Sequence, residues 1–175
     1  MRESGNRCCS RMNNSGMPVK RSRWVLLAYR VPREPSTPRI ALWRALRRLG
    51  AVQVVDGLAA LPLDARNREQ LEWLAESVVD ADGEAMVWIG ELGSAAQERE
   101  LTERMTETVA AEYGALVEEA NATREQSSGP QRRTLARLRR ELRRIRARDY
   151  FSPPERDRAQ EAVDELAASV EEPVR

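Results

Sequence analysis

Residues 24–51 read WVLLAYRVPREPSTPRIALWRALRRLGA and contain two elements separated by a proline-rich turn. The continuous apolar run 24–31, which a proline ends, is typical of a buried central strand. Thr37 is expected to cap the following helix, with Pro38 at its first position and Gly50 at its end. Helical spacing predicts that four apolar residues of this helix face the core: Ile40, Trp43, Leu46 and Leu49.

A hairpin, a second helix and a fourth strand are predicted next. Two apolar runs flank Asp56-Gly57, and such a pair between apolar runs is the strongest short-range hairpin signal. Residues 67–70 form a capping box, Gly83 is expected to end the helix, and residues 84–89 are predicted to form a strand. The apolar face of this helix is predicted to contain Leu71, Leu74, Ala75 and Val78.

The remainder of the chain is predicted to be helical. A first helix over 94–126 carries an apolar stripe at Leu101, Met105, Val109, Tyr113 and Leu116. Residues 127–130 (SSGP) are expected to break the helix, and 131–148 then carry a narrow apolar seam of Leu135, Leu138, Leu142 and Ile145. A capping box at 152–155 is expected to start the last helix, whose apolar face is Ala159, Val163, Leu166 and Val170.

The fold class that follows is α+β. Residues 23–93 have the predicted order β-α-β-β-α-β, which is the ferredoxin-like arrangement, and residues 94–175 form a helical extension of three helices. Residues 1–22 are predicted to be a disordered leader, and Met17 is a plausible true start. The adjacent Cys8 and Cys9 in this leader form a poor disulfide or metal pair, and their role stays open.

Composition excludes several classes of function. The chain of 175 residues contains no histidine, which removes the commonest general base and the commonest metal ligand. No apolar run approaches the ~18 residues of a membrane span, and residues 1–20 lack the apolar core of a secretory signal. We therefore expect a cytoplasmic protein without a cofactor. All four Trp residues lie in predicted elements and are expected to pack in the core: Trp24, Trp43, Trp73 and Trp88.

The sharpest functional feature is the basic helix at 131–148, which holds nine Arg and one Glu between two acidic segments. One row of arginines falls opposite the apolar seam and has no obvious acidic partner: Arg133, Arg137, Arg140, Arg144 and Arg148. Such a row suits DNA phosphates, although a solvated face chosen for solubility would have the same pattern. The arginines that flank the seam are expected to pair with Glu112 or Glu119 of the preceding helix: Arg132, Arg139, Arg143 and Arg146.

A second basic cluster surrounds the proline-rich turn. Arg30, Arg33 and Arg39 lie between the end of the first strand and the start of the first helix. A helix N-terminus favours anions, and guanidinium forks match tetrahedral oxyanions. The cluster is a candidate anion site, and ordinary surface pairing with Glu34 is the alternative.

Three segments of the sequence resemble the N-terminal domain of the ChrB chromate-resistance proteins: 29–36 (YRVPREPS), 43–51 (WRALRRLGA) and 83–86 (GEAM). The resemblance implies a homodimeric regulator of chromate-resistance operons that binds DNA and responds to chromate or another oxyanion. It also implies a second domain after this one, so a separate C-terminal-domain protein is a candidate partner.

An enzyme is not expected. The first strand ends Ala28-Tyr29-Arg30 without the carboxylate that a metal-dependent nuclease would need, and no nucleophile–base pair or phosphate loop occurs. Asp56 lies in a hairpin turn, where Asp is expected on conformational grounds. Beside the regulator, the remaining hypothesis is an interaction or scaffold protein whose Arg helix binds an acidic protein partner.

Overall fold

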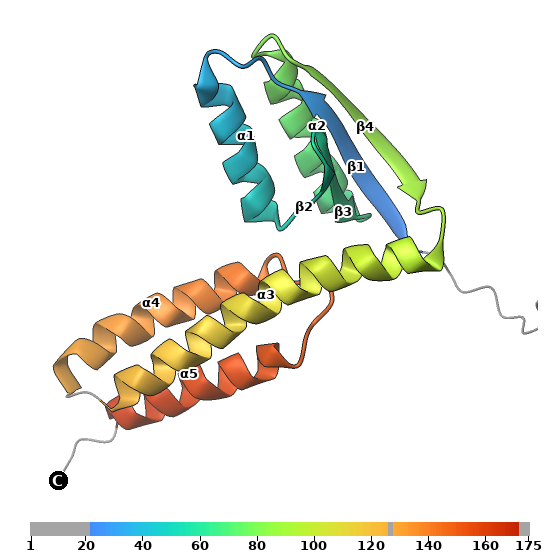
Figure 1. Ribbon diagram of the computed structural model, residues 1–175. Helices are drawn as coiled ribbons and strands as arrows, with labels where there is room; N and C mark the ends of the chain where they lie inside the picture. The colour runs from blue at the N-terminus through green and yellow to red at the C-terminus, as the bar shows by residue number, and fades with distance from the viewer. Residues whose placement is uncertain (1–21, 126–127, 172–175) are drawn as a thin grey trace, which may run out of the picture.

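The computed structural model describes residues 22–125 and 128–171, without the side chains of 128–130, and the predictions for Cys8, Cys9 and Met17 lie outside these residues. In the described part the fold is mixed α+β, with a four-stranded antiparallel sheet and five helices (Figure 1). The elements are β1 (Arg23–Arg30), α1 (Ser36–Leu49), β2 (Val52–Val55), β3 (Leu58–Pro62), α2 (Ala65–Val79), β4 (Glu84–Glu91), α3 (Ala95–Arg124), α4 (Ser128–Arg146) and α5 (Glu155–Glu171). None of these helices is long and apolar enough to cross a bilayer.

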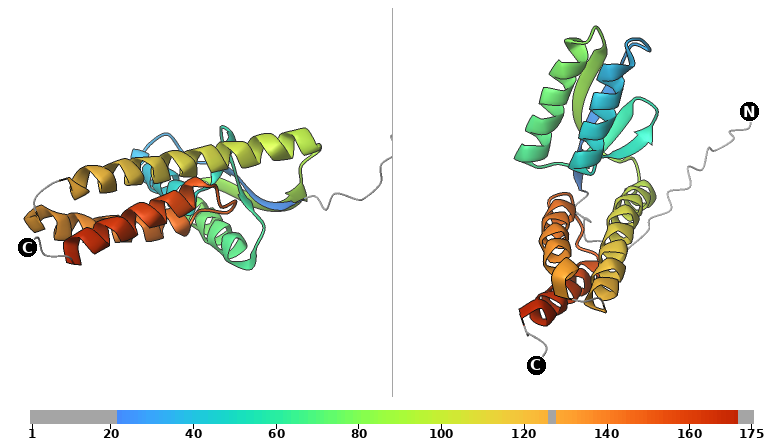
Figure 2. Two further views of the ribbon diagram at one scale, coloured as in Figure 1. Left: turned by 90° about the horizontal axis from the view of Figure 1, so that it is seen from below. Right: turned by 90° about the vertical axis from the view of Figure 1, so that its left-hand side faces the viewer.

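The sheet has the order β2-β3-β1-β4, with every neighbouring pair antiparallel. The apolar run predicted as a central strand is β1, and its Leu27 lies opposite Ala59 of β3 and Val87 of β4. Helices α1 and α2 lie side by side on one face of the sheet (Figure 2). The predicted hairpin is confirmed, with Gly57 in a left-handed conformation at φ 77° between β2 and β3.

Helices α3, α4 and α5 form a bundle beside one end of the sheet (Figures 1 and 2). The predicted apolar positions of α3 are all buried, but they serve two cores. Leu101 and Met105 belong to the core of the sheet, whereas Val109, Tyr113 and Leu116 belong to the core of the bundle. The 30-residue helix α3 therefore connects the two parts of the molecule through both cores.

The turn between α4 and α5 also joins the two parts. The Tyr150 hydroxyl donates to the Leu49 carbonyl oxygen at 2.8 Å, and the Phe151 ring lies 6.4 Å from the Trp24 ring between centroids. Burial, with a smaller contribution from the charge of Asp64, raises the pKa of Tyr150, which therefore stays a neutral donor.

Two helix starts differ from the prediction. Helix α1 begins at Ser36 after Pro35, and no side chain caps it, so Thr37 lies inside the first turn. Helix α2 begins at Ala65 because the Asp64 side chain accepts from the Asn67 N–H at 2.6 Å. An Asp at the N-cap satisfies a free N–H of the first turn, and this cap precedes the predicted capping box.

Two further boundaries were also wrong. Helix α4 begins at Ser128, so Pro130 lies in its first turn, where a missing N–H costs nothing. Ser152 has φ 48° and accepts a hydrogen bond from the Arg156 guanidinium at 2.7 Å instead of closing a capping box. Gly50 ends α1 as predicted, with φ 73°.

The prediction of four core Trp residues was wrong for three of them. Trp24 is 1% exposed, whereas the other three are 51%, 55% and 57% exposed: Trp43, Trp73 and Trp88. In α1 the buried residues are Leu42 and Leu46, and Ile40 faces solvent. Each helix covers the sheet with one side only, and no other described element covers the outer sides that carry Trp43 and Trp73. Trp88 lies on β4, where no described helix covers the second face of the sheet.

Candidate nucleic-acid interface

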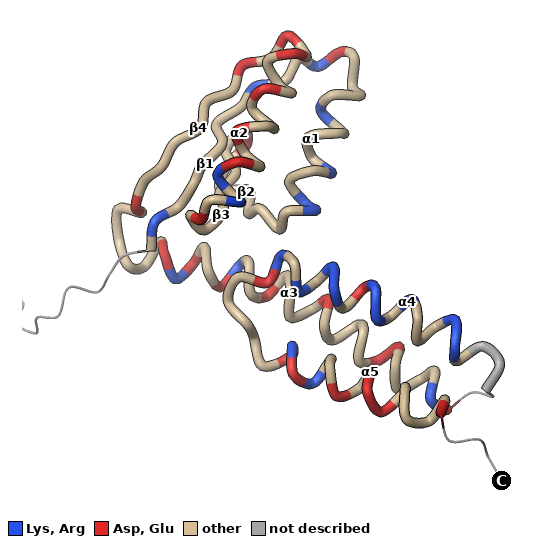
Figure 3. Tube along the Cα trace, turned by 180° about the vertical axis from the view of Figure 1, so that it is seen from behind, with Lys and Arg blue, Asp and Glu red and all other residues tan. Residues whose placement is uncertain are grey.

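The orientation of α4 is fixed by its apolar seam. Leu138 and Ile145 are each 1% exposed, and Leu135 and Leu142 are buried with them between α3 and α5, as predicted. Burying one Leu or Ile side chain contributes ~1.5–3 kcal/mol, so this face holds α4 in place. Most arginines on the other sides of the helix are exposed, and Figure 3 shows basic positions repeated along the length of α4.

The five arginines of the predicted row do not share one environment. Arg133 and Arg140 are exposed, and neither has a carboxylate partner within the described residues. Arg137 forms an ion pair with Glu119 of α3, and Arg144 lies 3.5 Å from Glu141 of its own helix. The expectation that the row lacks an internal acidic partner was therefore wrong for Arg137 and Arg144.

Arg148 is also paired, and it lies beyond the end of α4. Its guanidinium donates to Glu112 of α3, and its side chain is only 20% exposed. Because α3 and α4 run antiparallel, Glu112 meets the end of α4 and Glu119 meets its middle. The row is thus rotated toward α3, which sequence spacing on one helix cannot reveal.

The four flanking arginines were expected to pair with these two carboxylates, but no such pair forms in the described part of the chain, and three of the four are exposed. Arg132, Arg139 and Arg143 have no ion pair in the described part of the chain. We define the α4 basic surface as its six exposed arginines outside the α3 pairs: Arg132, Arg133, Arg139, Arg140, Arg143 and Arg144. Three of these six were missed as candidates because the rotation of α4 depends on α3. Arg146, the fourth flanking residue, is half-buried.

The predicted anion cluster is placed at the opposite end of the sheet domain. Arg30 ends β1 and donates to Glu84 of β4 at 2.5 Å, with both side chains more than 70% exposed. Arg33 lies in the turn and Arg39 in the first turn of α1, and both are exposed. The acidic partner in this cluster is therefore Glu84, which binds Arg30, and not the Glu34 considered from the sequence. The anion site at Arg30, Arg33 and Arg39 stays a prediction.

Taken together, these features define a class: a small α+β sheet domain joined to an antiparallel helical bundle with one strongly basic helix. Residues 39–128 match the family described as "Protein ChrB, N-terminal". The chain is also 30% identical over 132 residues to Protein ChrB of Cupriavidus metallidurans, which covers 73% of this chain and 40% of that protein. No solved structure matches the chain.

The chain therefore belongs to the ChrB N-terminal family, as the resemblance of its three segments indicated. It spans about 40% of the length of the curated relative that it matches. The family match begins inside α1 and ends at Ser128, the first residue of α4. The α4 basic surface lies after the matched region, so only the geometry of α4 indicates its role.

Proposed function

We propose that this protein is a regulator of chromate resistance and that its α4 basic surface binds the phosphate backbone of duplex DNA. The observation that carries the proposal is a set of five exposed arginines that have no carboxylate partner in the described part of the chain: Arg132, Arg133, Arg139, Arg140 and Arg143. They lie on a helix whose opposite face is buried in the bundle. Membership of the ChrB family supports the regulatory part. The geometry of α4 supports the DNA-binding part.

The chemistry of α4 fits phosphate recognition. Guanidinium groups are always charged and form bidentate hydrogen bonds to phosphate oxygens. Arg132 and Arg144 lie twelve residues apart, so the α4 basic surface extends ~18 Å along the helix axis at ~1.5 Å per residue. Exposed ion pairs contribute only ~0–1 kcal/mol, so Arg137 and Arg144 can exchange their carboxylates for phosphates at little cost.

Fluorescence anisotropy of labelled duplex DNA across a salt series tests the proposal. Each phosphate contact contributes a slope of about −0.9 to the plot of log K against log salt concentration. The triple variant Arg133→Gln, Arg140→Gln and Arg143→Gln is expected to flatten the slope by about three units, with little change between DNA sequences.

A matched control removes the same charge elsewhere, with Arg44→Gln, Arg66→Gln and Arg99→Gln on α1, α2 and α3. It is expected to leave the slope nearly unchanged. An unchanged slope in the α4 variant, or an equal change in the control, would contradict the assignment to α4.

A second function is favoured by one observation. Arg137 and Arg148 already bind carboxylates of the acidic helix α3, so the same helix could bind an acidic protein partner. This scaffold function predicts weak DNA binding by the intact chain and tight binding to an acidic polypeptide such as polyglutamate. Comparing the two ligands at one ionic strength separates the two functions.

The remaining parts of the proposal concern the whole protein. The order β-α-β-β-α-β and the sheet order β2-β3-β1-β4 support a ferredoxin-like domain at 23–93, followed by the helical extension at 94–175. We also propose a cytoplasmic, non-enzymatic homodimer that works with a C-terminal ChrB domain. The 40% coverage of the curated relative supports that last point.

A further inference from the structure

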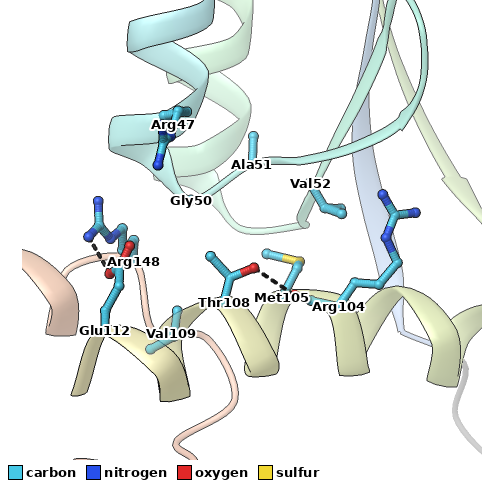
Figure 4. A pocket seen from close by; sticks show the side chains of 10 residues that line it. All are labelled: Arg47, Gly50, Ala51, Val52, Arg104, Met105, Thr108, Val109, Glu112 and Arg148. Atoms are coloured by element: carbon cyan, nitrogen blue, oxygen red, sulfur yellow. Dashed lines mark hydrogen bonds and ion pairs between the residues drawn. The ribbon is translucent and has the colours of Figure 1, made fainter. Parts of the chain in front are cut away.

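A cavity of about 150 Å³ lies where the sheet domain meets the bundle (Figure 4). The end of α1 and the start of β2 form one wall, and the middle of α3 with the turn after α4 forms the other. One water needs only roughly 10–15 Å³ on this scale, so the cavity has room for a larger occupant. None of the residues considered above as DNA or anion contacts lines it, apart from Arg148.

The charged lining of the cavity is strongly unbalanced. Three arginines from separate segments line the cavity: Arg47, Arg104 and Arg148. Glu112 is the one carboxylate among the lining residues. That carboxylate is bound by Arg148. The lining therefore carries a formal excess of two positive charges, and each guanidinium has five N–H donors of which the structure uses few.

Each arginine is held by a contact that leaves further donors available. The Arg47 guanidinium stacks over Trp43 at 4.9 Å from the ring centroid, and Figure 4 shows it pointing down from α1 toward the cavity. Arg104 donates one N–H to the Gln53 carbonyl oxygen at 2.6 Å. At the end of α1, the carbonyl oxygens of Arg47 and Leu46 accept from the Gly50 and Ala51 N–H groups.

An unsatisfied donor points to a missing acceptor. The Nε of Arg148 is buried and has no hydrogen-bond partner in the described part of the chain, although its terminal nitrogen binds Glu112. Buried N–H groups are almost always paired with protein, water or an ion. Gly50 packs directly against Arg148, since a Cβ on it would lie 2.8 Å from the Arg148 Cβ. An acceptor held in the cavity would satisfy this N–H.

We propose that this cavity binds a small tetrahedral oxyanion of charge −2, such as sulfate, hydrogen phosphate or chromate, between Arg47, Arg104 and Arg148. A tetrahedral dianion offers several acceptor edges to guanidinium groups on different walls and neutralises the excess charge. Water alone would satisfy Nε but would leave the charge uncompensated. The site is separate from the α4 basic surface, so it does not depend on the DNA-binding proposal.

Calorimetric titration of the full chain with sodium sulfate, phosphate and chromate at low ionic strength tests the site without DNA. Saturable binding of at least one anion is expected. Arg47→Gln should weaken it about tenfold, the factor typical of one lost hydrogen bond to a charged group. Glu112→Gln removes the competing carboxylate and should strengthen binding, an effect opposite to general damage to the fold.

Two control variants locate the anion. Arg44→Gln lies on the same helix as Arg47 but outside the cavity lining, and it should leave the affinity within about twofold. Arg33→Gln with Arg39→Gln removes two arginines of the candidate anion site at the proline-rich turn and so tests that alternative location. Loss of binding in that double variant, with no effect of Arg47→Gln and Glu112→Gln, would place the anion at the proline-rich turn and overturn the proposal. Absence of saturable binding by all three anions would overturn it as well.

Discussion

The bundle and the sheet domain are both built from amphipathic elements, but they differ in how many of their large apolar side chains are buried. In the bundle, the four seam residues of α4 are all buried. In the sheet domain, Trp43 lies on the predicted apolar face of α1 and Trp88 in an apolar stretch of β4, yet both remain more than half exposed, as does Trp73 of α2. The three helices of the bundle bury one another's apolar faces in one core. The two helices of the sheet domain cover only one face of the sheet, so their own outer sides and the opposite sheet face stay uncovered in the described part of the chain.

Apolar periodicity therefore indicates which residues can be buried. Which of them are buried depends on the number of layers that cover the element. This difference also separates two kinds of residue for experiment. Bundle positions should contribute strongly to stability, and the exposed Trp positions should contribute little.

Leu138→Ala should produce the largest loss of stability. Leu138 is 1% exposed in the centre of the bundle, and truncation of a tightly packed Leu costs ~2–5 kcal/mol. Urea unfolding followed by circular dichroism measures the change. A loss below about 0.5 kcal/mol, which is the level of a surface substitution, would show that the bundle core is not formed in solution.

Asp149→Ala should cost ~1–3 kcal/mol, because it leaves a buried hydroxyl without its acceptor. The Asp149 side chain is only 2% exposed. It accepts hydrogen bonds from the Tyr113 hydroxyl at 3.0 Å and from the Ser152 N–H at 2.8 Å. The same unfolding assay applies, with Asp164→Ala on the exposed side of α5 as the control. Equal effects of the two variants would mean that the turn after α4 is not held by Asp149.

The stability of the bundle should fall at alkaline pH. Burial and the hydrogen bond to Asp149 raise the pKa of Tyr113 from 10.0 to about 12, against opposing effects of Arg156 and Arg146. Between these values the unfolded chain loses the Tyr113 proton while the folded chain retains it, so the free energy of unfolding decreases as pH rises. Below pH 10 this contribution is fully present.

Tyr113→Phe is the variant that isolates this effect. It should unfold with a smaller decrease between pH 10 and 12, although its stability at pH 7 is lower because Asp149 loses a donor. Chemical unfolding at several pH values measures both quantities. Parallel pH profiles of the two proteins would contradict the raised pKa of Tyr113.

Trp88→Thr should have the smallest effect, about 1 kcal/mol or less, because Trp88 is 57% exposed and Thr keeps the β propensity of β4. The comparison with Leu138→Ala is the decisive one. A cost of several kcal/mol would show that the open face of the sheet is covered in solution by a second copy. Sedimentation of the variant and of the unchanged chain would then show the loss of the dimer.

Much of the local structure followed from the sequence alone. The mixed α+β character, the hairpin at Asp56-Gly57, the end of α1 at Gly50 and the seam of α4 follow from short-range patterns, and the structure confirms them. Membership of the ChrB family followed from three short segments. The basic character of α4 was equally local, because nine arginines in eighteen residues need no tertiary information.

Which of these arginine side chains are available to bind a ligand depends on the tertiary structure. The antiparallel packing of α3 on α4 rotates Arg137 and Arg148 onto Glu119 and Glu112 and leaves Arg139 and Arg143 outside. The cavity between Arg47, Arg104 and Arg148 arises from segments more than forty residues apart. Sequence spacing fixes the direction in which a side chain leaves its own helix. The partner that the side chain meets depends on how the helix packs against its neighbours, and the buried cores set that packing.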